Sequence, residues 1–294
     1  MRRVWTQPRW EGESLAGRTV LVHAEQGFGD TLQFVRWLKP LRTLAARVVF
    51  VAPSALVTLL QGSDVADQVV AFTDALPPHD VQVPLTGLPH RLSLHTDEAV
   101  MGSGAPYLRA APVMDAQLAA WCAELPHDRL TVGLAWAGSA THVNDRHRSL
   151  SLGLLEPLLR RSDVTWVSLQ TGERAGDLEK LPRRITVHDP TALLTSFGRT
   201  AQLVRQLDAV LTVDSAVAHL AGAFGRRCWL LLPRIGRDWR WAAEQNGRRW
   251  YTGVEPIRQQ TPGEWREELQ AVDARMTGLA AANEATSAGA RNRQ

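Results

Sequence analysis

The clearest candidate for an anion-binding site is a turn at Asp214 and Ser215, where an apolar segment passes directly into a helical one. The first N–H groups of a helix have no partner within it, and the helix dipole is positive there, so such a turn can hold a phosphate group. His219 lies four residues after Ser215 and shares its helix face, and the small Ala216 allows close approach. The residues equally allow an ordinary helix cap and a histidine that the protein itself satisfies.

A second turn, at residues 25–30, also follows an apolar segment. Its glycines, among them Gly29, permit tight backbone geometry. A third glycine is missing and an aspartate ends the turn, so the pattern is not the dinucleotide-binding fingerprint. The turn delivers Asp30 to the start of a helix, where a capping role is the alternative to a site role. Glu25 is a weaker candidate for a reactive carboxylate.

Two further segments carry polar or aromatic groups that suit a nucleotide sugar. Gln170 follows an apolar strand, where its amide can hydrogen-bond to a base, a ribose or a phosphate. Residues 238–241 place an acid, a base and two indoles together, and an aromatic face suits a sugar ring or nucleobase. The chain has 11 tryptophans, so most are structural, and we expect at most one of this pair, Trp239, to line a cleft.

Short apolar runs alternate with amphipathic ones, which is typical of βαβ units with a parallel sheet. We expect strands at residues 19–24, 48–52, 69–71, 81–83, 130–135, 165–169, 185–188, 209–213 and 229–232. We expect helices at residues 54–60, 112–125, 152–159, 197–207, 215–224 and 262–279. A further helix follows Asp30, and Pro40 should break or kink it.

The alternation stops and restarts near residues 126–128, which marks the best domain boundary. A chain of 294 residues is long enough for two domains. We therefore expect an N-terminal Rossmann-like domain over residues 1–126 and a C-terminal one, with a closing helix, over residues 127–279. Residues 280–294 are expected to be a disordered tail. Two such α/β halves leave a crevice at the carboxyl ends of their strands.

The composition is that of a globular protein, with 45% hydrophobic and 21% charged residues. The net charge is +3, and nearly all the basic residues are arginines. There is no block of like charge and no basic stripe interleaved with aromatic residues, so we do not expect nucleic-acid binding. A phosphate that needs a cation here should meet a guanidinium group, which binds it with two parallel hydrogen bonds.

Cysteine usage and hydropathy give expectations about the compartment. Cys122 and Cys228 are far apart and lack metal-ligand spacing, so both are expected to act as small apolar residues. The N-terminus has no apolar signal segment, and no run approaches the ~20 apolar residues of a membrane span. The expected location is the cytoplasm.

Six segments in order resemble a known group of proteins. They are His23–Thr31, Gly133–Gly138, Asn144–Ser149, Ser168–Gly172, the Asp-Ser-x-x-x-His motif at Asp214, and Asp238–Trp241. The Asp214 motif is similar to the Asp-Thr-Gly-x-x-His signature of ADP-heptose:lipopolysaccharide heptosyltransferases. The whole set most resembles the glycosyltransferase-like domains of bacterial tetratricopeptide repeat proteins, which are distant relatives of O-GlcNAc transferases. This resemblance implies a GT-B fold with two Rossmann-like domains, the donor on the C-terminal one, and a last helix that crosses back.

The resemblance also implies roles for residues of the crevice. Asp30 matches the general base for an acceptor hydroxyl, and the loop that holds Trp136 and Gly138 lies against the sugar-nucleotide diphosphate. Arg148 stands where heptosyltransferases carry a phosphate-binding lysine, so a planar fork replaces a compact ammonium. The alternative cations in this loop are Arg146 and His147. No Asp-x-Asp metal motif is present, and we expect neither a metal ion nor a cofactor.

The leading hypothesis from the sequence is metal-independent glycosyl transfer, with inversion, from a nucleotide-diphosphate sugar to a hydroxyl acceptor. One alternative is a nucleotide-sugar-binding or interaction module that has lost efficient catalysis. Another is a sugar-nucleotide epimerase or hydrolase on the same fold. Association with tetratricopeptide repeat segments is a further expectation. The residues do not specify the sugar, the base, the acceptor or the oligomeric state.

Overall fold

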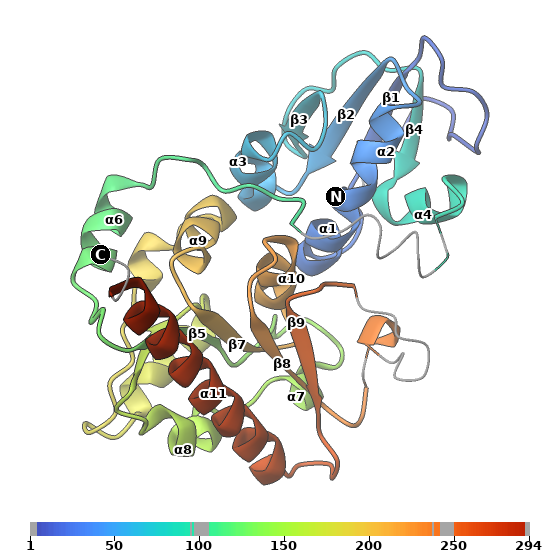
Figure 1. Ribbon diagram of the computed structural model, residues 1–294. Coiled ribbons are helices and arrows are strands. Elements are labelled where there is room, and N and C mark those ends of the chain that lie inside the picture. The colour runs from blue at the N-terminus through green and yellow to red at the C-terminus, as the bar shows by residue number, and fades with distance from the viewer. Residues whose placement is uncertain (1–4, 95, 97–105, 237, 242–249, 292–294) are drawn as a thin grey trace.

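A computed structural model describes residues 5–94, 96, 106–236, 238–241 and 250–291. These residues form two α/β halves, each built on a parallel sheet (Figure 1). In the N-terminal half the strand order is β3-β2-β1-β4. These strands are β1 (Thr19–His23), β2 (Arg47–Ala52), β3 (Gln68–Ala71) and β4 (Val81–Pro84). The two Rossmann-like halves expected from the alternating pattern are confirmed.

The second sheet has the order β6-β5-β7-β8-β9, and all its described pairings are parallel. Its strands are β5 (Leu130–Ala135), β6 (Val164–Ser168), β7 (Ala209–Val213), β8 (Cys228–Leu232) and β9 (Val254–Arg258). The sequence did not predict β9. The strand expected at residues 185–188 is only an isolated bridge between His188 and Val167.

The helices of the first half cover one face of its sheet. They are α1 (Phe28–Phe34), the 3₁₀-helix η1 (Val35–Trp37), α2 (Leu38–Arg42), α3 (Ser54–Gly62), η2 (Leu85–Gly87) and α4 (Leu88–Arg91). The chain does not break at Pro40. Instead, the 3₁₀-helix η1 interrupts the α-helical path just before α2, which contains the proline. This fits the missing N–H group of proline, which cannot extend the helical ladder.

The remaining helices follow the first sheet in the sequence. They are α6 (Ala116–Ala123), α7 (Asp145–Arg148), η3 (Leu152–Leu155), α8 (Glu156–Leu159), η4 (Glu173–Lys180), η5 (Thr191–Leu193), α9 (Phe197–Val204), α10 (Ala216–Ala223), η6 (Trp239–Trp241) and α11 (Arg266–Arg291). Helix α6 packs on α9, and Asp115 at its start forms an ion pair with Arg199 of α9. The segment before residue 126 therefore contacts the second half.

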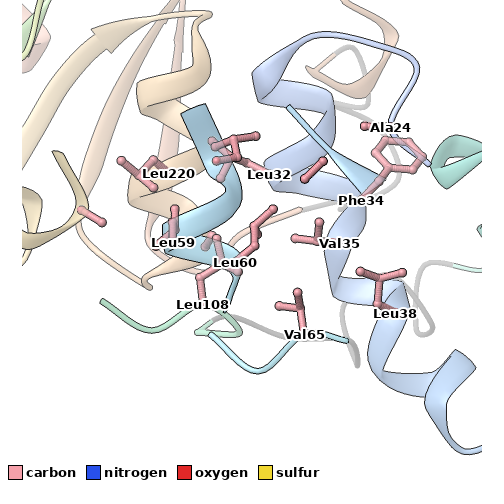
Figure 2. Packing of buried hydrophobic residues seen from close by; sticks show 14 of the residues in the cluster. Ala24, Leu32, Phe34, Val35, Leu38, Leu59, Leu60, Val65, Leu108 and Leu220 are labelled. Carbon is pink, nitrogen blue, oxygen red and sulfur yellow. The ribbon is translucent and has the colours of Figure 1, made fainter. Parts of the chain in front are cut away.

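One apolar core continues from the first half into the second. Figure 2 shows Leu32 of α1 and Leu59 of α3 close to Leu220 of α10. All three side chains are almost fully buried. Helix α1 makes its most extensive helix contact with α10. Burial of apolar surface across this contact stabilises the association of the two halves.

The last helix is longer than the sequence predicts. Helix α11 continues to Arg291, whereas the sequence predicts a disordered tail from residue 280. Alanines at 280–282 have high helix propensity, so they extend the helix. Its apolar residues pack in the core of the second half, and the described polar contacts are made there as well, through Asp273, Arg275 and Asn283. Trp250, which precedes this helix, also contacts the first half, because its carbonyl accepts a hydrogen bond from Arg36.

No helix in the described part of the chain is both long enough and apolar enough to cross a membrane.

Candidate active site

A cleft of about 650 Å³ lies between the two halves, at the carboxyl ends of their central strands. The first half lines it with the turn that leads into α1. The second half lines it with the loops after β5, β6, β7 and β8. The predicted site residues that line this cleft are Gly29, Asp30, Gly138, Arg148, Gln170, Asp214, Ser215, Ala216 and His219.

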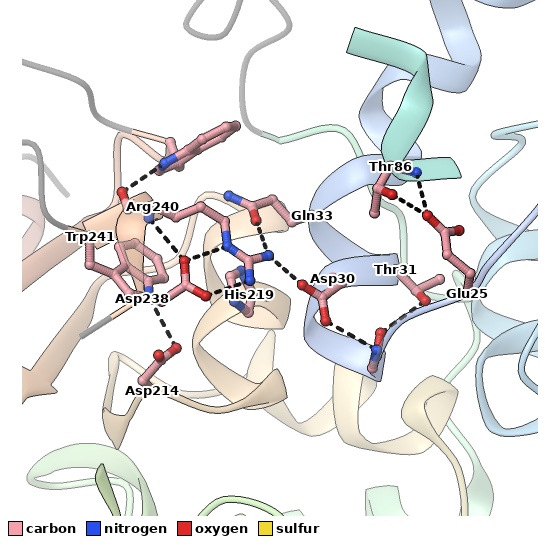
Figure 3. Close-up of polar contacts among 12 residues, drawn as sticks. Glu25, Asp30, Thr31, Gln33, Thr86, Asp214, His219, Asp238, Arg240 and Trp241 are labelled. Atoms are coloured by element: carbon pink, nitrogen blue, oxygen red, sulfur yellow. Dashed lines mark hydrogen bonds and ion pairs between the residues drawn. The ribbon is translucent and has the colours of Figure 1, made fainter. Parts of the chain in front are cut away.

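Asp30 lies at the start of α1 and accepts two hydrogen bonds, one from Gly27 of its own half and one from Arg240 of the other half (Figure 3). Its Oδ2 atom accepts the backbone N–H of Gly27 at 3.0 Å, so it does act as a helix cap. Its Oδ1 atom forms an ion pair with Arg240 of the other half. The Asp30 side chain is still 24% exposed and lines the cleft. Capping and access to a ligand are therefore compatible at this residue.

Arg240 is the main residue of this site that the sequence reasoning missed. Its guanidinium binds both oxygens of Asp238 at 2.7 Å and donates to Gln33 Oε1 at 3.1 Å. Burial alone lowers the pKa of Arg240, but Asp238 and Asp30 raise it overall above its ordinary value. Burial alone raises the pKa of Asp238, yet the bonds and charge of Arg240 lower it. Both groups are therefore charged. The available signal was the Asp-x-Arg spacing of residues 238–240.

The second turn, after β7, places Asp214 in a more buried setting. Asp214 Oδ1 accepts a hydrogen bond from the indole N–H of Trp241 at 3.0 Å. Burial raises the pKa of Asp214, and the Trp241 bond opposes this shift. Ser215 is the N-cap of α10, because its hydroxyl accepts the N–H of Val217 at 3.3 Å. The helix start next to the cleft is thus formed as expected, with Ser215 in a capping role.

His219 is buried between the two halves and does not act as a cation. Its Nδ1 atom lies 2.8 Å from the hydroxyl of Tyr251, and its ring stacks on Trp241 with 5.4 Å between centroids. Burial, reinforced by the charges of Arg240 and Arg36, lowers its pKa to about 3. The imidazole is therefore neutral at physiological pH and satisfied by the protein.

Gly29 lets α1 and α10 approach each other at His219. A Cβ atom at Gly29 would lie 2.7 Å from His219 Cδ2 and 3.7 Å from the Cα of Ala216. Real Cβ atoms do not come that close to another atom, so a larger residue would push the two helices apart. The absence of a side chain at this position serves the contact between the halves.

The loop after β5 directs Arg148 into the cleft. Its Nη1 atom donates to the carbonyl oxygen of Asp214 at 3.0 Å, and its Nε atom lies 3.3 Å from Asp145 Oδ1. A Cβ at Gly138 would lie only 2.4 Å from Arg148 Nη2, so glycine makes room for the guanidinium. Arg146, the alternative cation, is exposed and contacts the neighbouring His147. Arg148 is the better placed of the three.

Gln170 organises the same loop from the end of β6. Its Oε1 atom accepts the backbone N–H groups of Trp136 at 3.1 Å and Ala137 at 2.9 Å. The expectation that Trp136 contacts a donor is corrected. Its side chain is fully buried in the second core, and its indole N–H donates to Asp177 at 3.1 Å. A large apolar ring at a strand end gains more from this burial than from exposure in a cleft.

Glu25 is a poorer candidate than Asp30 for the reactive carboxylate, because it is not among the residues that line the cleft. It accepts the backbone N–H groups of Leu85 and Thr86, each at 3.1 Å, and also binds the Thr86 hydroxyl. It therefore fixes the start of η2. The side chain of Trp239 lies outside the described residues, so its expected contact with a sugar or base stays a prediction. Among the described residues, no group of three or more His, Cys, Asp or Glu side chains is placed to hold a metal ion.

The chain was compared with known families, curated proteins and solved structures. No family model matches it. Protein FlbA of Caulobacter vibrioides is 24% identical over 308 residues, covering 93% of this chain and 48% of FlbA. The chain thus spans about half the length of that relative.

The solved structures bear on the fold. Escherichia coli ADP-heptose lipopolysaccharide heptosyltransferase II matches with a TM-score of 0.61 and 12% identity, covering 90% of this chain and 99% of that one. A glycosyl transferase of family 9 from Veillonella parvula DSM 2008 matches with a TM-score of 0.58 and 11% identity, covering 90% and 93%. At these TM-scores the chain shares its overall fold with both structures. The chain has a GT-B-like fold of the kind that these glycosyltransferases share.

Proposed function

We propose that this protein transfers a glycosyl group from a nucleoside-diphosphate sugar to a hydroxyl acceptor. The observation that carries the proposal is the pairing of groups in one cleft. An accessible carboxylate, Asp30, stands on one wall, and Arg148 with the start of α10 at Ser215 stands on the other. The GT-B-like fold of the glycosyltransferases with similar structures supports this assignment.

The second half suits the leaving group. Loss of a nucleoside diphosphate places new negative charge on the oxygen that leaves the sugar, and fixed cations and dipoles stabilise such charge. Arg148 supplies a cation, and the first turn of α10 supplies the positive end of a helix dipole. His219 adds no charge, because its lowered pKa keeps it neutral. These groups act without a divalent metal ion, so metal independence is part of the proposal.

The first half suits the acceptor. In the proposed step, Asp30 accepts the proton of an acceptor hydroxyl as the acceptor oxygen bonds to the anomeric carbon of the sugar. The bond from that carbon to the diphosphate oxygen breaks, and the diphosphate leaves with the electron pair. Because the base and the diphosphate-binding groups lie on opposite walls, attack comes from the face opposite the leaving group, with inversion. The sugar is a hexose or a heptose.

ADP-heptose is the first donor to test, because one structural relative is named as an ADP-heptose enzyme. We also propose that the domain works beside tetratricopeptide repeat segments and in the cytoplasm. The sequence resemblance supports the first of these, and the second is the expectation from hydropathy. Neither affects the chemistry of the cleft.

The test is a panel of nucleoside diphosphates and their sugars, measured by thermal shift and by donor consumption with and without a chelator. A true donor near saturation should raise the stability by a few kcal/mol, roughly as expected for ligand at 100 times its Kd. Donor consumption that needs an added acceptor and survives the chelator supports the proposal. If no nucleotide binds, the proposal is wrong.

The same panel separates the alternatives. Binding without consumption in the presence of any acceptor would indicate a binding module. The contact of Asp30 with Arg240 is the observation that favours this alternative, because it occupies one carboxylate oxygen in the structure. Donor consumption without an acceptor would indicate a hydrolase or an epimerase.

A further inference from the structure

We propose that Arg240 is a positioning residue that orients Asp30 across the cleft, and that residues 238–241 join this carboxylate to the donor turn at Asp214. The inference deepens the proposed function and rests on it for the role of Asp30. Arg240 belongs to the second half, whereas Asp30 belongs to the first. The orientation of the candidate base therefore depends on the half that would carry the donor.

The contacts of Arg240 show that it is held rigidly. Asp238 binds its Nε and Nη2 atoms in a two-point fork, and Gln33 binds its Nη1 atom. The backbone carbonyl of Arg240 also accepts the indole N–H of Trp250 at 2.8 Å. An arginine held at both its head and its backbone loses little further freedom when it contacts a carboxylate. It is suited to fix a partner in place.

Asp30 keeps open hydrogen-bond positions on its carboxylate in this arrangement. Gly27 donates to one carboxylate oxygen and Arg240 to the other. Each carboxylate oxygen has two lone pairs, so one site on each oxygen stays open after these two bonds. The side chain also lines the cleft. Arg240 can therefore orient Asp30 without displacing an acceptor hydroxyl.

The next residue ties the same segment to the donor turn. Trp241 donates its indole N–H to Asp214 and stacks on His219 of α10. As Figure 3 shows, Arg240 and Trp241 extend from one short segment to the two carboxylates, Asp30 and Asp214. If this segment moved, the contacts that hold Asp30 and Asp214 would change together.

The experiment compares Arg240→Gln and Arg240→Lys with a matched control, Arg199→Gln. Arg199 also forms an ion pair with a carboxylate, Asp115, but lies outside the residues that line the cleft. With ADP-heptose as the donor probe, Arg240→Gln should lower kcat about 100-fold and change the donor KM less than about 3-fold, because a misplaced base slows the chemical step. Arg240→Lys should recover part of kcat, and Arg199→Gln should leave kcat unchanged.

Two outcomes would overturn the proposal. The first is an Arg240→Gln enzyme with unchanged kcat. The second is a rise in donor KM as large as the fall in kcat/KM, which would make Arg240 a donor-binding residue. If Arg240→Gln does not fold, Asp238→Asn removes the bracing carboxylate charge and should lower kcat in the same direction.

Two measurements that do not depend on enzyme activity, thermal unfolding and a crystal structure, test this inference separately from the proposed function. In thermal unfolding, the double variant Asp30→Asn with Arg240→Gln should lose less stability than the sum of the two single variants. A crystal structure of Arg240→Gln should show the Asp30 carboxylate turned from its position or in several rotamers. Additive losses and an unmoved carboxylate would reject the positioning role even if the enzyme is active. If both results are as expected but no nucleotide sugar is consumed, only the proposed function fails.

Discussion

The cleft has two turns built on one plan, and they hold their carboxylates in opposite ways. In each half a central strand, β1 or β7, leads through a turn into the helix that meets its counterpart, α1 or α10. Asp30 at the first turn faces a cation and stays partly exposed. Asp214 at the second turn faces the neutral indole of Trp241, and burial raises its pKa.

This difference suits the Asp30 carboxylate to proton transfer and the Asp214 carboxylate to holding neighbouring side chains in place. A carboxylate that takes part in proton transfer must be reached by its substrate. Asp30 meets this condition on the cleft wall, while the more buried Asp214 uses one oxygen to fix Trp241 and its backbone oxygen to hold Arg148. Helix termini of the same kind can thus serve different roles, decided by the partners that the other elements bring.

The strongest test of the comparison is Asp30→Asn. Asparagine keeps the size and can still accept the Gly27 N–H, but it cannot take a proton from an acceptor. We expect transfer to fall by about 100- to 10,000-fold, the range for loss of a general base, while ADP binding in a titration stays unchanged. Glu25→Gln on the same turn is the matched control and should keep most activity. Equal losses in both variants would assign Asp30 a purely structural role.

On the other wall, Arg148→Gln should weaken donor binding. Loss of charge-assisted hydrogen bonds to a diphosphate corresponds to a rise of about 10- to 100-fold in the Kd for ADP. Arg146→Gln, two residues earlier, changes an exposed arginine whose described partner is His147 and should have little effect. Calorimetric titration measures both. If Arg146→Gln were the more damaging change, the diphosphate would lie elsewhere in the loop.

The sequence sufficed for much of the fold because apolar runs mark buried parallel strands. It did not reveal β9, where Glu255 and Pro256 interrupt the apolar pattern. The structure explains the exception, because β9 is the edge strand of its sheet and a proline without an N–H group is tolerated there. Residues 280–291 were the opposite case. Their composition, rich in Ala, Asn, Ser and Arg, suggested disorder, but alanine-rich segments also extend helices.

At the site, local pattern located the turns but not the partners across the cleft. The strand-to-helix transitions correctly placed Asp30 and Ser215 at helix starts, which here line the cleft, since helix starts can be read from a few adjacent residues. Arg240 is 210 residues away from Asp30, and only the packing of α1 against α10 brings them together. The same packing buries His219, which its helix face alone suggested as a ligand-binding residue.

The supporting role of Asp214 can be measured with Trp241→Phe. Phenylalanine can still stack on His219, but it cannot donate to Asp214, so a buried carboxylate loses a partner. Trp229→Phe is the matched control, because Trp229 is fully buried and its indole nitrogen has no partner among the described residues. Chemical denaturation should show that Trp241→Phe lowers the free energy of unfolding by about 2 kcal/mol more than Trp229→Phe. Equal losses would mean that both variants are destabilised only by the smaller side chain, and that the hydrogen bond to Asp214 does not contribute to stability.

The smallest expected effect concerns the pH dependence of stability at the contact between the two turns. The folded-state pKa of His219, about 3, lies below its ordinary value of 6.5, so the unfolded chain binds the proton more readily. The stabilisation is fully present above pH 6.5 and is lost as the pH falls toward 3. At pH 5.5 the loss is about 1.3 kcal/mol relative to pH 7. His219→Gln, which has no proton to bind, should flatten the stability curve by this amount.

His127→Gln, at an exposed histidine, should leave the curve unchanged. Denaturant titrations from pH 5.5 to 7.5 measure the difference. An unchanged slope in His219→Gln would show that the imidazole can be protonated in the folded chain, and the second turn would then carry a charge of its own.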